Sequence, residues 1–254
     1  MKSIIRLILN YIPRTVLTRI STFVKPIIRL YLKGDKYTDP IDGKSFRKFI
    51  PYGYNNVRKN ALSPSTYSLE RHRMLWLYLK NETKIFSNKV KLLHFAPEPA
   101  FYEIFKKSNN ILYDTIDLNS PLADIKADIC NLPLKDDTYD FILCNHVLEH
   151  IKDDLKAMSE LYRVLKKGGI GIFQIPVDSK RENTYEDRSI KSPKERNRMF
   201  GQYDHVRIYG QDYFDKLRSG GFKVKAINYT SSFSEKDLIR YCLTKGELIP
   251  FVYK

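Results

Sequence analysis

Several side chains that could do chemistry follow short apolar segments in the middle of the chain. Asp117 ends the run Tyr113-Asp114-Thr115-Ile116-Asp117. A carboxylate in this position can bind both hydroxyls of a ribose, because it has two acceptor oxygens for a vicinal diol. Asn145 and His146 end a later apolar run, and His205 follows a long charged segment. Histidine exchanges protons near neutral pH, so these residues indicate a nucleoside site with a proton acceptor beside it.

The segments that must position these side chains alternate between short apolar runs and helical patterns, which is typical of βαβ units. The runs are Lys91–Phe95, Leu112–Ile116, Phe141–Asn145 and Ile170–Ile175. Right-handed crossovers between such runs give an open, mainly parallel α/β sheet. Ligands bind at the carboxyl ends of its strands, where Asp117 and His146 are expected.

The helix between the last two runs has the clearest pattern. Asp153 and Asp154 favour its start, and we expect the pair Gly168-Gly169 to stop it. Its apolar stripe consists of Leu155, Met158, Leu161, Tyr162 and Leu165.

Short motifs in this region carry a family resemblance. They are Asp128-Ile129, Leu132-Pro133-Leu134, Tyr139-Asp140 before a strand, and Leu148-Glu149-His150. Together they resemble the class I S-adenosylmethionine-dependent methyltransferases of the small-molecule type (Methyltransf_11-like), over roughly residues 88 to 254. The resemblance implies a Rossmann-like sheet, mostly parallel with an antiparallel last strand and helices on both faces. It also implies S-adenosylmethionine as the cofactor.

The resemblance assigns cofactor roles to particular residues. Asp117 would hold the ribose, Leu118 and Ile129 would flank the adenine, and Asp128 would accept from the exocyclic amine. The alternative for Asp128 is a carboxylate that stabilises a turn. Asn145 and His146 would lie beside the methionine and sulfonium.

The loop after the first strand departs from the family pattern of an acidic residue followed by G-x-G-x-G. Here His94-Phe95 leads into Ala96-Pro97-Glu98-Pro99-Ala100, without glycine. We therefore expect different torsions and a more crowded approach to the cofactor. The resemblance implies that His94, Phe95, Ala96 and Glu98 bind the cofactor. One hypothesis is that Glu98 pairs with the ammonium of the methionine moiety. The other is that the domain binds no cofactor and acts as a scaffold.

The acceptor side of the predicted site draws on the segment after the run Ile170–Ile175. His146 or His205 is the expected general base. The charged insertion at about 178–205 is expected to cover the acceptor, since it is too long for an ordinary connection. Tyr203 and Arg207 are candidate acceptor-binding residues, with an ion pair to a neighbouring carboxylate as the alternative for Arg207. No metal site is expected.

Residues 1–34 form a basic arm with apolar positions at helical spacing on both sides of Pro13. We predict two amphipathic helices that anchor the protein at an anionic membrane surface. The alternative is that their apolar faces pack on the rest of the protein or on a second subunit. The uncharged run Leu7–Pro13 is too short for a transmembrane helix. The arm has no acidic residue and seven basic ones: Lys2, Arg6, Arg14, Arg19, Lys25, Arg29 and Lys33.

The connecting segment, residues 35–87, is rich in turns and ends in a predicted helix at Leu69–Lys80. Asp39 and Asp42, with Ser63 and Thr66, have the spacing of two zinc-knuckle pairs, but none of the four is cysteine. The segment therefore resembles a knuckle without metal, and chance spacing is the alternative.

Composition restricts the partners and the compartment. Three cysteines without a C-x-x-C pair indicate a reducing, cytoplasmic compartment, peripheral to the inner membrane face if the arm binds lipid. The net charge of +15 favours a polyanionic partner. The expected acceptor is a small molecule or a membrane-proximal glycan or lipid precursor. RNA methylation is the alternative, although an N-P-P-Y element and a Pro-Cys dipeptide are absent. The sequence does not indicate an oligomeric state.

Overall fold

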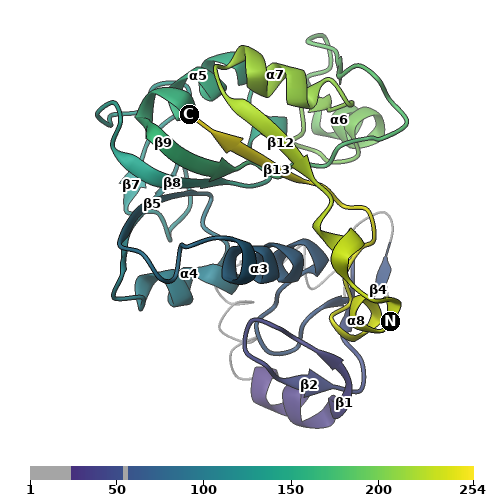
Figure 1. The fold of residues 1–254 in the computed structure, drawn as a ribbon. Coiled ribbons are helices and arrows are strands. Elements are labelled where there is room, and N and C mark those ends of the chain that lie inside the picture. Colours follow the sequence, from purple (N-terminus) through teal and green to yellow (C-terminus); the bar gives the residue numbers. More distant parts are fainter. Residues whose placement is uncertain (1–23, 54–56) are drawn as a thin grey trace. The chain divides into compact units, whose positions relative to one another are not determined.

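The computed structural model describes residues 24–53 and 57–254, which divide into two compact units (Figure 1). The larger unit contains residues 77–232 and 245–254, and the smaller contains the chain up to Trp76 together with residues 233–244. The predicted segment boundaries after residues 34 and 87 do not coincide with this division. Among the described residues, every helix is too short or too polar to cross a bilayer.

The larger unit is built on a seven-stranded sheet with the order β12-β13-β9-β8-β5-β6-β7. All neighbouring pairs from β9 to β7 are parallel, whereas β13 is antiparallel to both β9 and β12. The predicted, mostly parallel sheet with an antiparallel last strand is confirmed. The strands are β5 Val90–Phe95, β6 Ile111–Asp117, β7 Ile125–Lys126, β8 Tyr139–Cys144, β9 Leu165–Ile172, β12 Lys223–Ile227 and β13 Ile249–Tyr253.

Helices cover both faces of this sheet, with α5 and α7 on one face and α4 on the other (Figure 1). Met158, Leu161 and Leu217 from α5 and α7 are fully buried in the main apolar core. The helical elements are α4 Pro99–Lys106, η1 Leu148–His150, α5 Asp154–Val164, α6 Pro193–Phe200, α7 Tyr213–Ser219 and η2 Tyr229–Ser232.

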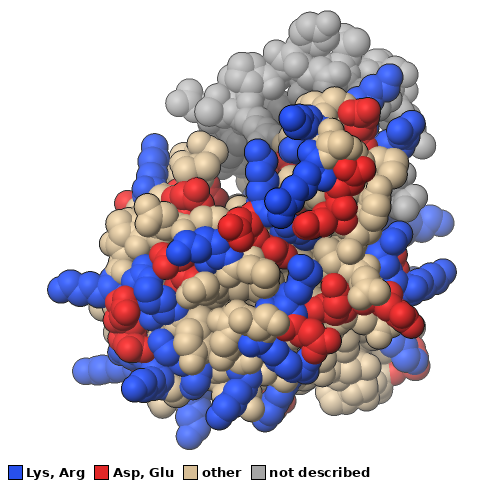
Figure 2. All heavy atoms as spheres, turned by 90° about the horizontal axis from the view of Figure 1, so that it is seen from above, with Lys and Arg blue, Asp and Glu red and all other residues tan. Residues whose placement is uncertain are grey.

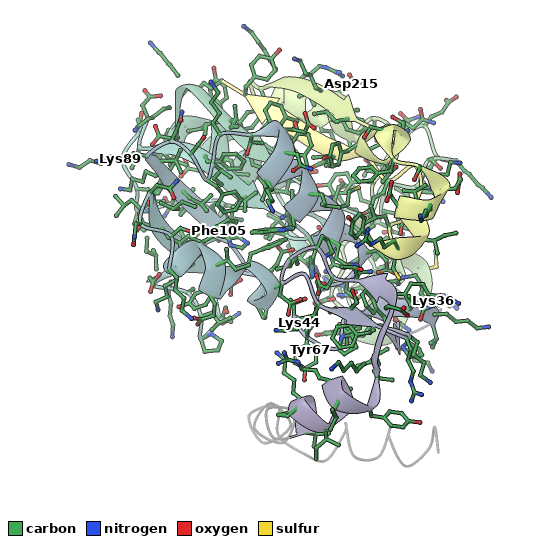
Figure 3. All side chains as sticks on the ribbon, turned by 60° about the horizontal axis from the view of Figure 1, so that its bottom comes forward. Lys36, Lys44, Tyr67, Lys89, Phe105 and Asp215 are labelled. Carbon is green, nitrogen blue, oxygen red and sulfur yellow. The ribbon has the colours of Figure 1, made fainter. Side chains whose placement is uncertain are left out.

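The face under α4 is held by an aromatic cluster around Phe105, which Figure 3 labels. Its ring stacks on Phe86 with 6.0 Å between centroids and lies 5.6 Å from the ring of Tyr113 on β6. The buried residues Ala100, Phe101 and Phe105 recur at helical spacing in α4 and form this packing face. The cluster fixes the helix that starts directly after the loop between β5 and α4.

Helix α5 begins as predicted, since the carboxylate of Asp153 accepts a hydrogen bond from the backbone N–H of Lys156. The prediction that Gly168-Gly169 stops it is wrong. The helix ends at Val164, because Leu165 is already extended and buried in β9. Gly168, with φ +75°, instead lies where the pairing of β8 and β9 changes register, and donates to the carbonyl of Lys254.

The smaller unit contains two antiparallel strand pairs, a short helix and the first part of a longer helix, α3. Helical residues 24–31 lead into an apolar cluster of Leu32, Phe46 and Phe49. Most of the predicted arm, residues 1–23, lies outside the described residues. The elements are β1 Lys33–Thr38, β2 Ser45–Phe46, β3 Ile50–Tyr52, β4 Arg58–Leu62 and α8 Glu235–Arg240, with α3 Glu70–Glu82 running from this unit into the larger one.

The positions with knuckle spacing come together in the smaller unit through hydrogen bonds. Oδ2 of the fully buried Asp39 accepts from the hydroxyls of Thr66 (2.5 Å) and Ser68 (3.0 Å). The hydroxyl of Ser65 donates to Asp42 (3.1 Å). Lys44 and Tyr67 of the two turns are labelled in Figure 3. Carboxylate–hydroxyl bonds thus join the two turns.

Arg73 of α3 ties this unit together from its interior. Its guanidinium is fully buried and donates to four backbone carbonyls, those of Ala61, Ser68, Tyr241 and Cys242. Tyr241 and Cys242 directly follow α8, so the side chain of Arg73 joins residues 61–68 to the segment after α8.

We predict that Asp39→Ala lowers the free energy of unfolding of the smaller unit by about 2–3 kcal/mol, because the half-buried hydroxyl of Thr66 and the buried hydroxyl of Ser68 lose a charged acceptor. Trp76, the only tryptophan, reports on this unit by fluorescence during urea unfolding. Asp35→Ala, at an exposed carboxylate of β1, is the control. Equal midpoints for the two variants would contradict the role of Asp39.

Candidate functional site

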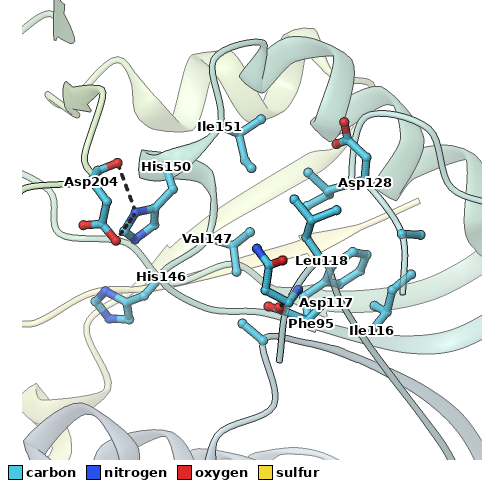
Figure 4. A pocket seen from close by; sticks show the side chains of 14 residues that line it. Phe95, Ile116, Asp117, Leu118, Asp128, His146, Val147, His150, Ile151 and Asp204 are labelled. Atoms are coloured by element: carbon cyan, nitrogen blue, oxygen red, sulfur yellow. Dashed lines mark hydrogen bonds and ion pairs between the residues drawn. The ribbon is translucent and has the colours of Figure 1, made fainter. Parts of the chain in front are cut away.

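A cavity of about 460 Å³ opens at the carboxyl ends of β5, β6 and β8 (Figure 4). This is the edge where ligands bind to open parallel sheets, and the volume suits a nucleoside-sized ligand. The lining residues are Phe95, Ala96, Ile116, Asp117, Leu118, Asn119, Ala127, Asp128, Ile129, His146, Val147, His150, Ile151 and Asp204.

Asp117 lies in this cavity with a fixed carboxylate. Its Oδ1 accepts hydrogen bonds from the backbone N–H groups of Asn119 (2.7 Å) and Ser120 (2.6 Å). Within the described part of the chain, no hydrogen bond to Oδ2 is present. The loop therefore orients the carboxylate and leaves acceptor capacity for a ligand, as a ribose diol requires.

The predicted adenine-flanking residues line the same cavity. Leu118 exposes 61% of its surface although it is apolar, whereas Ile129 and Phe95 are buried. Asp128 also lines the cavity, but its Oδ1 accepts from the N–H of Cys130 at 2.8 Å, which is the turn role given above as its alternative. The exposed side chain of Leu118 can therefore pack against a planar ring such as adenine. Oδ2 of Asp128 takes no part in the hydrogen bond to Cys130.

Two lining residues at strand ends have left-handed backbone torsions. Ala96 has φ +47° and His146 has φ +54°, a region that favours glycine. Backbone hydrogen bonds hold both conformations, from Ala96 to Ile116 (3.0 Å) and from His146 to Gln174 (2.7 Å). Ala96, which stands in place of the first glycine, therefore adopts a left-handed φ typical of glycine, and our expectation of different torsions is wrong at this residue. Its methyl group adds bulk at the cavity wall.

Three of the predicted cofactor residues lie behind the cavity wall. His94, Glu98 and Asn145 are buried and do not line the cavity. The Oε2 atom of Glu98 lies 3.3 Å from both His94 Nε2 and Asn145 Nδ2, and His94 Nδ1 lies 2.9 Å from the hydroxyl of Tyr113. These contacts connect the ends of β5, β6 and β8. The geometry gives the three residues a supporting position rather than one at the wall.

A group of histidines surrounds one buried carboxylate at the other side of the cavity. His146 Nδ1 lies 3.2 Å from Glu149 Oε1. His150 Nδ1 lies 3.4 Å from Asp204 Oδ2, as the dashed lines in Figure 4 show. The rings of His150 and His205 meet edge to face at 4.8 Å. His205 itself does not line the cavity.

The electrostatics of this group follow from burial and from the histidines. Burial raises the pKa of Glu149, but the hydrogen bond from His146 and the neighbouring histidines outweigh it, and the pKa is lowered overall. Burial also lowers the pKa of His205, which favours its neutral form. The site therefore combines an ionised carboxylate with a neutral imidazole.

The two predicted acceptor-binding residues have different surroundings. Arg207 is buried, 2.8 Å from Glu186 Oε2 and 3.4 Å from Asp154 Oδ2. It thereby holds β11 (Arg207–Ile208) against β10 (Tyr185–Glu186) of the insertion. The surroundings of Arg207 therefore match the ion pair with a neighbouring carboxylate, which was the alternative to acceptor binding. Tyr203 is 52% exposed and lies outside the cavity lining.

Some residues of the site were not assigned a role from the sequence. Val147, Ile151 and Asp204 line the cavity, and Glu149 orients His146. Glu149 and His150 were visible as part of the Leu148-Glu149-His150 motif, but no local signal pairs them with Asp204 and His205, more than fifty positions later.

Comparisons with known proteins agree with this geometry. Residues 94–173 match the family model Methyltransf_11, described as a methyltransferase domain. This segment is similar to the class I S-adenosylmethionine-dependent methyltransferases. The methyltransferase domain has the expected Rossmann-like sheet, and S-adenosylmethionine is the methyl donor of this class.

Curated relatives match parts of this chain. An uncharacterized protein of Methanocaldococcus jannaschii is 40% identical over 99 residues, 36% of this chain and 43% of that protein. The demethylmenaquinone methyltransferase of Streptomyces avermitilis is 44% identical over 52 residues, 20% of this chain and 22% of that protein. The chain thus spans less than half the length of the curated relatives it matches.

A solved structure resembles the chain over most of its length. The crystal structure of the cyclase SpnF has a TM-score of 0.50 and 15% identity, covering 92% of this chain and 95% of that one. At this identity the likeness shows the fold alone.

We predict that Ala96→Gly raises the free energy of unfolding by up to about 1 kcal/mol, because relief of the left-handed torsion outweighs the added chain entropy. The matched control, Ala100→Gly in α4, should lower it by about 1 kcal/mol or more. Thermal unfolding measures both. Destabilisation by Ala96→Gly as large as that of the control would show that the torsion carries no strain.

Proposed function

We propose that this protein transfers a methyl group from S-adenosylmethionine to a small-molecule acceptor. The observation that carries the proposal is the fixed carboxylate of Asp117 at the end of β6, inside a cavity whose apolar walls suit an adenine. The family match over residues 94–173 supports it. A matched relative acts, by its name, on demethylmenaquinone, which agrees with a small-molecule acceptor.

The residues around the cavity supply what methyl transfer requires of a protein. The cofactor provides the methyl group on a sulfonium and leaves as a neutral thioether. An acceptor hydroxyl or amine loses its proton when it gains the methyl group, and His146 can receive that proton. Glu149 accepts from Nδ1 of His146 and so directs Nε2 as the free basic nitrogen. This pair supports His146, rather than His205, as the proposed base.

For the finer class of acceptor we propose a membrane-proximal glycan or lipid precursor. The helical residues 24–31 expose the apolar side chains Val24, Ile27, Leu30 and Tyr31. Lys25 and Arg29 lie on the same short helix. Exposed apolar side chains with half-buried cations beside them suit an anionic bilayer surface.

RNA is the less favoured acceptor. On the face that Figure 2 shows, lysine and arginine side chains are scattered among acidic and uncharged ones and do not form a continuous stripe. Proteins that follow a phosphate backbone gather their cations along it. A scaffold without cofactor is the other alternative, and cofactor binding separates it from the proposal.

We predict that titration calorimetry detects S-adenosylmethionine and S-adenosylhomocysteine binding in the micromolar range, about −8 kcal/mol. Asp117→Ala should abolish detectable binding, because the ribose loses its acceptor. His146→Gln should keep the affinity within about tenfold and slow methyl transfer to labelled acceptors in cell extract by about 100-fold or more.

The matched control is Asp215→Ala, at an exposed carboxylate of α7, which should bind like the unaltered protein. Absence of binding at millimolar cofactor by the unaltered protein would favour the scaffold. Labelling of RNA alone in the extract would refute the small-molecule acceptor.

We predict that the full-length protein floats with vesicles containing phosphatidylglycerol at low salt but not with phosphatidylcholine alone. Ile27→Asp combined with Leu30→Asp should abolish flotation, because it places charge on the apolar face. Ile239→Asp, at an exposed apolar residue of α8, is the control. The anchor is disproved if the unaltered protein stays at the bottom of the gradient.

A further inference from the structure

The histidine group beside the cavity contains a carboxylate oxygen that its surroundings do not satisfy. Glu149 is 98% buried, yet within the described part of the chain its Oε2 has no hydrogen-bond partner. An ionised oxygen in such a position is costly unless a cation or strong donor faces it. Oε1 is already used by His146.

The imidazoles of His150 and His205 lie close to the carboxylate of Glu149. Donor atoms of Glu149, His150 and His205 all lie within 4.8 Å of one another. Four ligands around Zn²⁺ with bonds of about 2 Å stand roughly 3.3 Å apart, so an ion would draw the three groups slightly together. The rings of His150 and His205 already touch.

The outer contacts of both rings match those of metal-bound histidines. His150 directs Nδ1 to Asp204, and His205 has a hydrogen bond with the backbone of Phe200. Each ring thus has one nitrogen engaged by a protein oxygen, and a metal ion would use the other. Metal-ligating histidines usually use their second nitrogen in this way, which fixes the ring and its tautomer.

We propose that Glu149, His150 and His205 bind a divalent transition-metal ion at the edge of the cavity. One carboxylate and two imidazoles suit Zn²⁺, Fe²⁺ or Co²⁺ and leave positions open for other ligands. His146 stays outside the ligand set, hydrogen-bonded to Oε1 of Glu149. Sequence alone predicted no metal site, because the third ligand comes from the end of the insertion.

The open positions suggest a function for the ion, and this step rests on the proposed methyl transfer. His150 lines the cavity, so an acceptor oxygen in the cavity can reach the ion. Coordination lowers the pKa of a hydroxyl, as it does for bound water. The acceptor would then be an oxygen nucleophile that gives its proton to His146 while its oxygen gains the methyl group.

The test uses Co²⁺ as the probe on full-length protein dialysed against a chelator. The unaltered protein should bind one equivalent, with visible d–d absorption typical of nitrogen and oxygen ligands. Glu149→Gln and His205→Asn should each weaken binding at least about tenfold. Glu103→Gln, at an exposed carboxylate of α4, is the matched control.

Circular dichroism and thermal unfolding show whether each variant is folded. Lack of binding by the folded, unaltered protein overturns the proposal, as does equal binding by all four proteins. The cofactor titration is separate: Co²⁺ binding without cofactor binding supports the metal site and refutes methyl transfer. Where the cofactor binds, full methyl transfer by the chelated protein overturns the role of the ion.

Discussion

The site depends on the parallel register of three strands. Phe95 at the end of β5 pairs with Ile116 of β6 and with Cys144 of β8, so all three strands end at the same level. Ala96, Asp117 and Asn145 therefore leave the sheet together. The buried contacts of Glu98 with His94 and Asn145 then connect these ends. A shift of one residue between β5 and β6 would turn Asp117 away from the cavity.

Most of the methyltransferase fold could be predicted from the sequence, because its elements have strong local patterns. The first three apolar runs, the cap at Asp153 and the antiparallel finish lie close to their observed positions, whereas β9 begins five residues before the predicted run Ile170–Ile175. The position of Asp117 at the cavity could be predicted because this residue ends an apolar run of the expected parallel sheet. The pair Gly168-Gly169 led to a wrong helix end, because a left-handed glycine occurs at a register change between strands as well as at the end of a helix.

Contacts between distant segments could not be derived in this way. Glu98 reads as a loop residue, but the rigid Pro97-Glu98-Pro99 sequence directs it inward toward His94. Nothing near His205 in the sequence indicates that its ring meets His150. The knuckle-like spacing of Asp39 and Thr66 was visible, whereas the hydrogen bond that joins them depends on the tertiary fold.

The path of the chain between the two units constrains how the protein can be made. Residues 233–244 return to the smaller unit, and only then does the chain supply β13, the single strand that pairs with both β9 and β12. During synthesis β12 therefore emerges without a neighbour, as an unpaired edge with five residues of exposed backbone groups. The sheet closes only when β13 has left the ribosome. Nascent chains would accordingly need protection at this edge until β13 has been synthesised, while the strands β5, β6 and β8 around the cavity can already be paired.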